Sequence, residues 1–145
     1  MTVGEVCTYL QGRAPFETAE EYDNVGLLVG SPDMPACRIL VTLDITPAAV
    51  RAAVIFSPLK RLDTGSIPYR LAGAGIAAIC VHTNLDRAAG GVGDLLAVRL
   101  ELDDIQTAAD GICRIGRPTE PRSPRDFAAF VGKRLGTPVR LRAGT

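Results

Sequence analysis

The sequence predicts an α/β fold, in which helices cover both faces of a layered sheet whose strands are mostly parallel or mixed. Short apolar runs typical of strands alternate with segments whose apolar residues recur at helical spacing, and this alternation is characteristic of α/β layers. The run Ile76–Val81 is apolar throughout, as expected of a strand that is covered on both faces. With 145 residues, the chain is long enough to bury a core.

The first part of the chain is expected to hold a helix, two strands and the start of a second helix. Thr2 and Glu5 form the capping-box pattern that opens an amphipathic helix. An acidic loop leads into a short strand over residues 25–30, and the apolar run over residues 38–46 predicts a second strand. Pro47 suits the first position of the helix that follows.

The alternation is interrupted after Val54. The helix over residues 47–54 would be about 12 Å long, and Ile55 and Phe56 are too few for a strand before the next proline. A helix that lies back over a sheet should lead to another strand, since a whole crossover needs about a dozen residues or more. The sequence therefore predicts a missing strand between Val54 and Ile55, with a Cα distance there well above the ~3.8 Å of a trans peptide.

The second part of the chain resumes the alternation. The expected elements are a helix over 67–77 that ends near Gly73 or Gly75, a strand over 77–84, a helix over 88–102, a strand over 111–118, a helix over 124–135 capped by Ser123, and a strand over 137–144. Helical spacing predicts that the helix over 88–102 buries Val92, Leu95, Leu96 and Leu100.

Composition limits the class of protein. No apolar run reaches the roughly 18 residues of a membrane helix, and the first residues, "MTVGEVCTYL", lack the basic leader of a signal peptide. The cysteines are widely scattered and show no paired metal spacing, so we expect reduced thiols and a cytoplasmic location. They are Cys7, Cys37, Cys80 and Cys113.

Charge is unevenly distributed along the chain. The net charge is zero, but the segment from Arg114 onward holds eight basic residues against Glu120 and Asp126. A basic segment of this kind could contact nucleic acid or nucleotide phosphate. Its aromatic residues, Phe127 and Phe130, suit the inner face of a helix better than a base-stacking platform. We therefore expect a solvated basic face and no nucleic-acid partner.

A candidate site follows the strand that ends at Val81. His82, the one histidine of the sequence, and Asp86 come directly after this strand, and ligands of open α/β sheets bind outside the carboxyl ends of strands. An imidazole and a carboxylate together are suitable ligands for a transition metal. Taken alone, the pair favours two residues that satisfy loop backbone groups, and metal binding is the alternative.

Other candidate motifs have simpler interpretations. The "GGVGD" stretch from Gly90 to Asp94 could cradle phosphate at a helix start, but it lacks a lysine and the longer P-loop spacing, which favours a tight turn. Asp44 could cap a helix. Asp23 and Asn24 could form a turn or the rim of the crevice beside His82. With a single histidine and no G-x-S-x-G elbow, nothing specific indicates a Ser-His-Asp triad.

Four stretches in order, "AEEYDNVGLLVG", "ILVTLDITPAAV", "IFSPLKRL" and "VHTNLDRAAGGVGDLLAVRLEL", resemble the Nif-three-like family, also described as GTP cyclohydrolase I type two homologues. The resemblance runs from Met1 to about Leu102, and "GICRIGRPTEPRSPRDFAAFVGKRLG" is similar to the family's next segment. It implies the Nif-three-like fold in incomplete form. Residues 1–110 would be the family's N-terminal α/β part, and residues 111–145 a strand-helix-strand continuation.

The resemblance also implies a function. The family looks like dinuclear-metal hydrolases, so it implies two divalent transition metal ions that activate water on an anionic or nucleotide-like substrate, in a homo-oligomer of six subunits. Asp86 matches the metal-ligating aspartate of the H-T-N-x-D motif. His82 matches the histidine of that motif, which lies beside the metals, and we expect it to be catalytic.

This sequence departs from the family pattern in two places. The family's H-H-P motif, on the strand before the segment matching "IFSPLKRL", is missing, and so are the histidine and glutamate of its C-terminal motif. The sequence therefore lacks most of the metal ligands that the resemblance implies. The alternative function is a non-catalytic scaffold or binding protein with an incomplete metal site.

Overall fold

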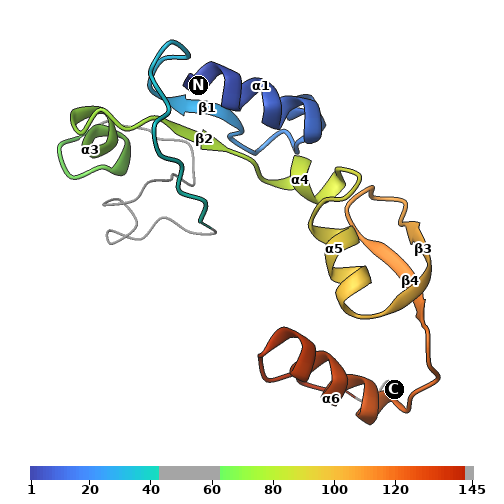
Figure 1. The fold of residues 1–145 in the computed structure, drawn as a ribbon. Coiled ribbons are helices and arrows are strands. Elements are labelled where there is room, and N and C mark those ends of the chain that lie inside the picture. The colour runs from blue at the N-terminus through green and yellow to red at the C-terminus, as the bar shows by residue number, and fades with distance from the viewer. Residues whose placement is uncertain (43–62, 143–145) are drawn as a thin grey trace. The chain divides into compact units, whose positions relative to one another are not determined.

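The computed structural model describes residues 1–42 and 63–142 (Figure 1). The predicted break between Val54 and Ile55 lies outside these residues. The chain divides into two compact units, Met1–Ala89 and Gly90–Thr145. The division into residues 1–110 and 111–145, which follows the family resemblance, stays a prediction.

The first unit begins with α1 (Val3–Arg13), whose start is confirmed as a capping box. The Thr2 backbone N–H donates to the Glu5 carboxylate at 2.7 Å, and the Glu5 N–H donates to the Thr2 hydroxyl at 3.2 Å. Further N–H groups of the first turn donate to the carbonyls of Met34 and Pro32. These bonds satisfy the donors that a helix start leaves unpaired, and they tie α1 to the segment after the first strand.

The remaining elements of the first unit form a small sheet with short helices. They are the 3-10 helix η1 (Phe16–Thr18), the strand β1 (Gly26–Val29), the helix α3 (Ile67–Gly73), the strand β2 (Ala78–Cys80) and the helix α4 (Thr83–Arg87). The predicted strand over 77–84 ends early, because a helix begins at Thr83. The predicted strand over 25–30 and the helix end near Gly73 are confirmed.

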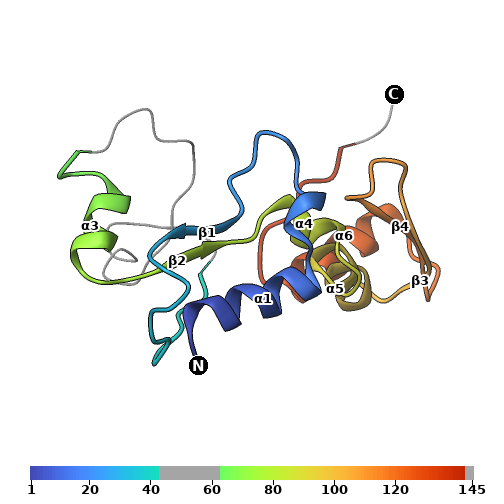
Figure 2. The same cartoon turned by 90° about the horizontal axis from the view of Figure 1, so that it is seen from above.

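Strand pairing brings two distant loops together. β1 and β2 are antiparallel, with Gly26 opposite Cys80 and Leu27 opposite Ile79, and α1 lies beside β1 (Figures 1 and 2). The core beneath this pair is built on Leu71, which is fully buried, and Ala78. In an antiparallel pair, the residues before one strand lie beside those after the other. The loop before β1 therefore meets the turn after β2, where His82 lies.

The second unit contains α5 (Val92–Arg99), the strands β3 (Leu102–Thr107) and β4 (Arg114–Pro118), and the helix α6 (Pro124–Leu135). The two strands form an antiparallel hairpin, as a short connection requires. The Asp110 carboxylate holds the connecting turn by accepting from the N–H groups of Ile112 and Cys113, at 2.9 and 3.0 Å. The Ser123 hydroxyl caps α6 by accepting from the Asp126 N–H at 3.2 Å, as expected.

The α/β class is confirmed, but the strand pairs of the described residues are antiparallel, where parallel or mixed pairing was expected. The segments 38–42 and 137–142 are not strands, because no described strand pairs with them. β3 was not expected at all. The predicted burial of Val92, Leu95 and Leu96 on α5 is wrong, since all three are exposed. Helical spacing predicts which residues lie on the same face of a helix. It does not predict whether another part of the chain covers that face.

None of the helices in residues 1–42 and 63–142 combines the length and the apolar character that a membrane crossing requires.

Candidate functional site

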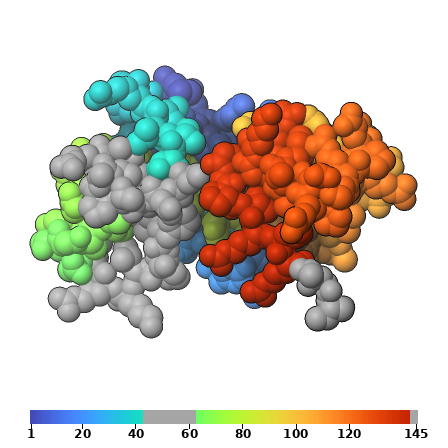
Figure 3. Space-filling model, turned by 90° about the horizontal axis from the view of Figure 1, so that it is seen from below, coloured from blue at the N-terminus to red at the C-terminus, as the bar shows by residue number. Residues whose placement is uncertain are grey.

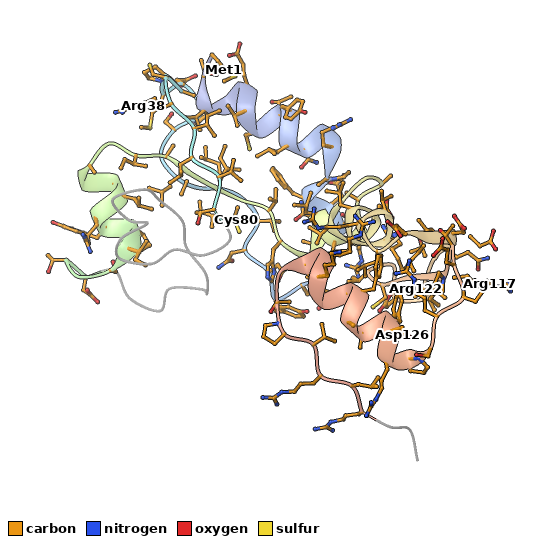
Figure 4. The ribbon with its side chains drawn as sticks, turned by 60° about the horizontal axis from the view of Figure 1, so that its bottom comes forward. Met1, Arg38, Cys80, Arg117, Arg122 and Asp126 are labelled. Atoms are coloured by element: carbon orange, nitrogen blue, oxygen red, sulfur yellow. The ribbon has the colours of Figure 1, made fainter. Side chains whose placement is uncertain are left out.

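The pair at the centre of the candidate site is Asp23, from the loop before β1, and His82, from the turn after β2. One carboxylate oxygen, Oδ1 of Asp23, lies 2.7 Å from Nδ1 of His82. The Asp23 side chain is 2% exposed, whereas the His82 side chain is 44% exposed. The carboxylate is therefore buried behind the ring, and part of the imidazole faces solvent. Cys80, labelled in Figure 4, marks the end of the strand that carries the chain to this pair.

The second carboxylate oxygen of Asp23 is held by Thr83. It accepts from the Thr83 backbone N–H at 3.2 Å and from the Thr83 hydroxyl. Burial by itself would raise the pKa of Asp23, but the hydrogen bonds from Thr83 and His82 outweigh it and leave this pKa below its ordinary value. Asp23 is therefore an anion at neutral pH, with both oxygens occupied by donors.

Asn84 anchors the site to the rest of the unit. Its side chain is fully buried. Its amide nitrogen donates to the carbonyl of Ala14, after the last turn of α1, at 2.8 Å, and its amide oxygen accepts from the backbone N–H of His82 at 2.7 Å. One side chain thus fixes the backbone of the candidate catalytic residue against the end of α1. The role of Asn84 has no local signal in the sequence, because it depends on a partner 70 residues away.

Asp86, the predicted metal ligand, lies in α4, whose N-cap residue is His82. Its side chain is half-buried, and within residues 1–42 and 63–142 no hydrogen bond or ion pair reaches its carboxylate. A carboxylate that is partly removed from water without a protein partner is a suitable ligand for a cation. The structure thus leaves the Asp86 oxygens available, in contrast to those of Asp23.

The donors available near His82 do not complete a metal site on their own. Nδ1 of His82 faces Asp23, whereas Asp86 offers carboxylate oxygens, which suit a divalent metal ion. However, the described part of the chain contains no group of three or more His, Cys, Asp or Glu residues placed to hold a metal ion. Two metal ions would need several protein ligands besides Asp86.

Cys80 is not a suitable nucleophile. It is buried at the end of β2. Burial, and secondarily the charge of Asp23, raises the pKa of its thiol above the ordinary value. Because the thiolate is the reactive form, a raised pKa keeps this cysteine inert.

The "GGVGD" stretch is a closed turn. The Gly90 N–H donates to the Asp94 carboxylate at 2.7 Å, and the Arg114 guanidinium pairs with the other oxygen of Asp94. Arg114 is almost fully buried and also donates to backbone carbonyls, including that of Ile112 at 3.0 Å. The Gly90 N–H, which a bound phosphate would need as a donor, thus already donates its hydrogen bond to Asp94. This geometry supports the tight-turn interpretation.

The basic segment of the second unit forms a shallow groove of about 460 Å³, lined by Arg99, Phe130, Lys133 and Arg134. Figure 3 shows α6 and the segment before it on one face, and Figure 4 labels Arg122, the residue two positions before α6. The Arg122 guanidinium lies 3.8 Å from the centroid of the Phe130 ring. Glu101 pairs with Arg122 at 3.6 Å and with Arg134. Several of the cations are thus already paired within the unit.

Sequence reasoning named His82 and Asp86, and it left the role of Asp23 open between a turn and the rim of a crevice. The structure places Asp23 at the site, in contact with His82, and leaves its neighbour Asn24 exposed. Asp44 lies outside the described residues. The signal that could have identified Asp23 is the polar D-N pair immediately before a short apolar strand, since polar residues at strand ends often gather at one edge of a sheet.

Comparisons with known proteins agree on one family. The sequence profile of Duf34/NIF3 (NGG1p interacting factor 3) matches residues 1–144. A GTP cyclohydrolase 1 type 2 homolog of Staphylococcus epidermidis is 36% identical over 121 residues, which cover 72% of this chain and 33% of that protein. A protein of the same name from Bacillus subtilis is 31% identical over 90% of this chain and 38% of its own length. The chain thus spans about a third of the length of these relatives.

Solved structures show the same relationship. A Bacillus cereus protein related to NIF3 is 30% identical with a TM-score of 0.66, over 74% of this chain and 34% of that one. A hypothetical protein of Staphylococcus aureus is 24% identical with a TM-score of 0.77, over 94% of this chain and 65% of its own, and shares the fold. The profile match along nearly the whole chain and the identity to curated relatives show that this chain belongs to the Duf34/NIF3 family of GTP cyclohydrolase 1 type 2 homologues.

Proposed function

We propose that this chain carries part of the active site of a metal-dependent hydrolase, with Asp86 as a metal ligand and His82 as a catalytic residue beside it. The observation that carries the proposal is the half-buried Asp86 carboxylate, which has no partner among the described residues and lies in the short helix whose N-cap position is His82. Two divalent transition metal ions in such a site would lower the pKa of bound water and polarise the substrate. Protein ligands besides Asp86 are required for two ions.

The proposed substrate is a small anionic or nucleotide-like molecule. The relatives are named for a cyclohydrolase that acts on GTP, which supports a nucleotide-like substrate without fixing the reaction. We also propose a cytoplasmic homo-oligomer, with a hexamer as the expected form. The exposed apolar residues of α5, Leu95 at 64% and Val98 at 67%, support self-association, because exposed apolar patches often mark interfaces.

The two roles can be separated by replacing His82 with alanine. We expect His82→Ala to reduce hydrolysis of a nucleotide-like substrate by roughly 100-fold or more, as loss of an acid–base residue does, while the bound metal changes little. Turnover and metal content by elemental analysis should be measured on the same preparation. The exposed Asp33 provides a control variant, Asp33→Ala. A loss of metal as large as the loss of turnover would make His82 a ligand instead.

The alternative is a non-catalytic scaffold or binding protein. The absence of a three-donor cluster among the described residues favours it. This alternative would be supported if a metal-loaded preparation hydrolysed no nucleotide substrate although the contact between His82 and Asp23 was intact.

We propose no nucleic-acid partner for the basic segment. Arg122 and Arg134 are paired with Glu101, so fewer cations remain to replace the counterions of a phosphate backbone. Titration with duplex and single-stranded nucleic acid at two salt concentrations should show only weak binding. Tight binding with a steep dependence on salt would contradict this prediction.

A further inference from the structure

The contact between Asp23 and His82 has a chemical consequence beyond the placement of His82. Oδ1 of Asp23 lies 2.7 Å from Nδ1 of His82, and the other carboxylate oxygen accepts two hydrogen bonds from Thr83. The carboxylate is therefore held from both sides and cannot turn away from the ring. An ionised carboxylate only accepts hydrogen bonds. The ring nitrogen that faces it must then carry a proton.

A neutral imidazole has one N–H and one lone pair. If the proton is on Nδ1, the lone pair is on Nε2, at the far side of the ring from the buried carboxylate. The His82 side chain is 44% exposed while that of Asp23 is 2% exposed, so the ring offers solvent a side that Asp23 does not cover. The depressed pKa of Asp23 agrees with a carboxylate that stays ionised while it accepts this bond.

We infer that Asp23 is a positioning residue, which holds His82 in the Nδ1–H tautomer and presents Nε2 as a proton acceptor. In hydrolysis, Nε2 takes a proton from water as the water oxygen forms a bond to the electrophilic atom of the substrate: the O–H bond breaks, an N–H bond forms, and Asp23 offsets the imidazolium charge. The bond from that atom to the leaving oxygen then breaks, and the same proton passes from Nε2 to the leaving oxygen, which restores the neutral ring. The role in turnover rests on the proposed hydrolase function, whereas the tautomer does not.

A purely structural role would explain the pair less well. The loop before β1 is already attached to α4 by other bonds: the Glu20 N–H donates to the Thr83 hydroxyl at 2.9 Å, and the Arg87 guanidinium donates to the Thr18 carbonyl at 2.7 Å and pairs with Glu20. The contact between Asp23 and His82 adds little to this attachment. What it adds is a fixed tautomer on a partly exposed ring.

The test is the ¹⁵N spectrum of the histidine ring in the 145-residue chain. His82 is the one histidine of the sequence, so selective labelling gives a single imidazole. In alkaline buffer, where an imidazole is neutral, the wild type should show Nδ1 as the protonated nitrogen and Nε2 as the unprotonated one. In Asp23→Asn, the amide N–H can donate to Nδ1, so the tautomer should shift toward Nε2–H. Asp33→Asn, at an exposed position, should leave the wild-type spectrum unchanged.

The same variants should be compared in hydrolysis assays of a metal-loaded form of the protein that carries the further metal ligands. Asp23→Asn should lower kcat roughly 100- to 10,000-fold with KM and metal content little changed, as loss of a tautomer-fixing carboxylate does elsewhere. A wild-type spectrum with Nε2–H would overturn the inference even if the variant does not fold. An inverted tautomer with unchanged kcat would overturn the positioning role. A wild type with Nδ1–H but no hydrolysis would overturn the proposed function and still support the tautomer.

Discussion

Replacing Asn84 with alanine is expected to lower the free energy of unfolding by about 2–4 kcal/mol, because it leaves two hydrogen-bonding groups without partners, each worth about 1–3 kcal/mol when buried. These groups are the Ala14 carbonyl, in a residue only 1% exposed, and the His82 backbone N–H. Urea unfolding followed by circular dichroism would measure the change. This is the largest stability effect that we expect from a single polar residue of the described structure.

Two further variants sharpen this test. Asn84→Asp keeps an oxygen for the His82 N–H but turns a carboxylate toward the Ala14 carbonyl, so it should destabilise the chain at least as strongly as Asn84→Ala. Asn24→Ala removes an exposed amide and should change stability by no more than about 0.5 kcal/mol, as surface substitutions do. Equal stability of the Asn84 and Asn24 variants would show that the buried bonds of Asn84 are not important.

Local signals in the sequence predicted the helix starts well. Thr2 with Glu5 and Ser123 with Asp126 are caps that act over three residues, so the pattern contains everything that the geometry needs. The same holds for the strand at Gly26–Val29, which is short, apolar and bounded by glycines.

Features that depend on distant partners were not predictable in the same way. Whether two strands pair parallel or antiparallel depends on which segments of the chain come together, and no short stretch of sequence specifies that. Both pairs in the described residues are antiparallel. β3, with the sequence LDDIQT, carries two acids and has mostly exposed residues, so it lacks the alternation that indicates a strand. It forms because a hairpin turn brings it against β4.

The candidate site shows the same limit. His82 and Asp86 are four residues apart and belong to one motif, so the sequence could group them. Thr83 and Asp23 are 60 residues apart, and only the pairing of β1 with β2 brings their segments into contact. The sequence could therefore suggest Asp23 as a candidate, but it could not assign it a partner.

Replacing Asp86 with asparagine is expected to reduce metal affinity sharply. Mutation of a residue that only supports a metal ligand typically lowers the affinity by roughly 10–100-fold, and loss of a ligand itself should cost at least as much. The substitution keeps the size of the side chain and removes its negative charge, so a neutral amide oxygen replaces an anionic ligand. Because no hydrogen bond or ion pair reaches this carboxylate within the described residues, the fold should remain unchanged. Circular dichroism and the urea midpoint should match the wild type, which separates a loss of metal from a loss of structure.

The most direct test of the proposed site is the number of transition metal ions bound per subunit in a form of the protein that carries the further metal ligands. It is measured by elemental analysis for the wild type, Asp86→Asn and the surface control Asp33→Asn in parallel. Our account predicts bound metal in the wild type and the control, and a sharp loss in Asp86→Asn with the fold intact. The same metal content in all three proteins would contradict the assignment of Asp86 as a ligand, and with it the proposed metal site.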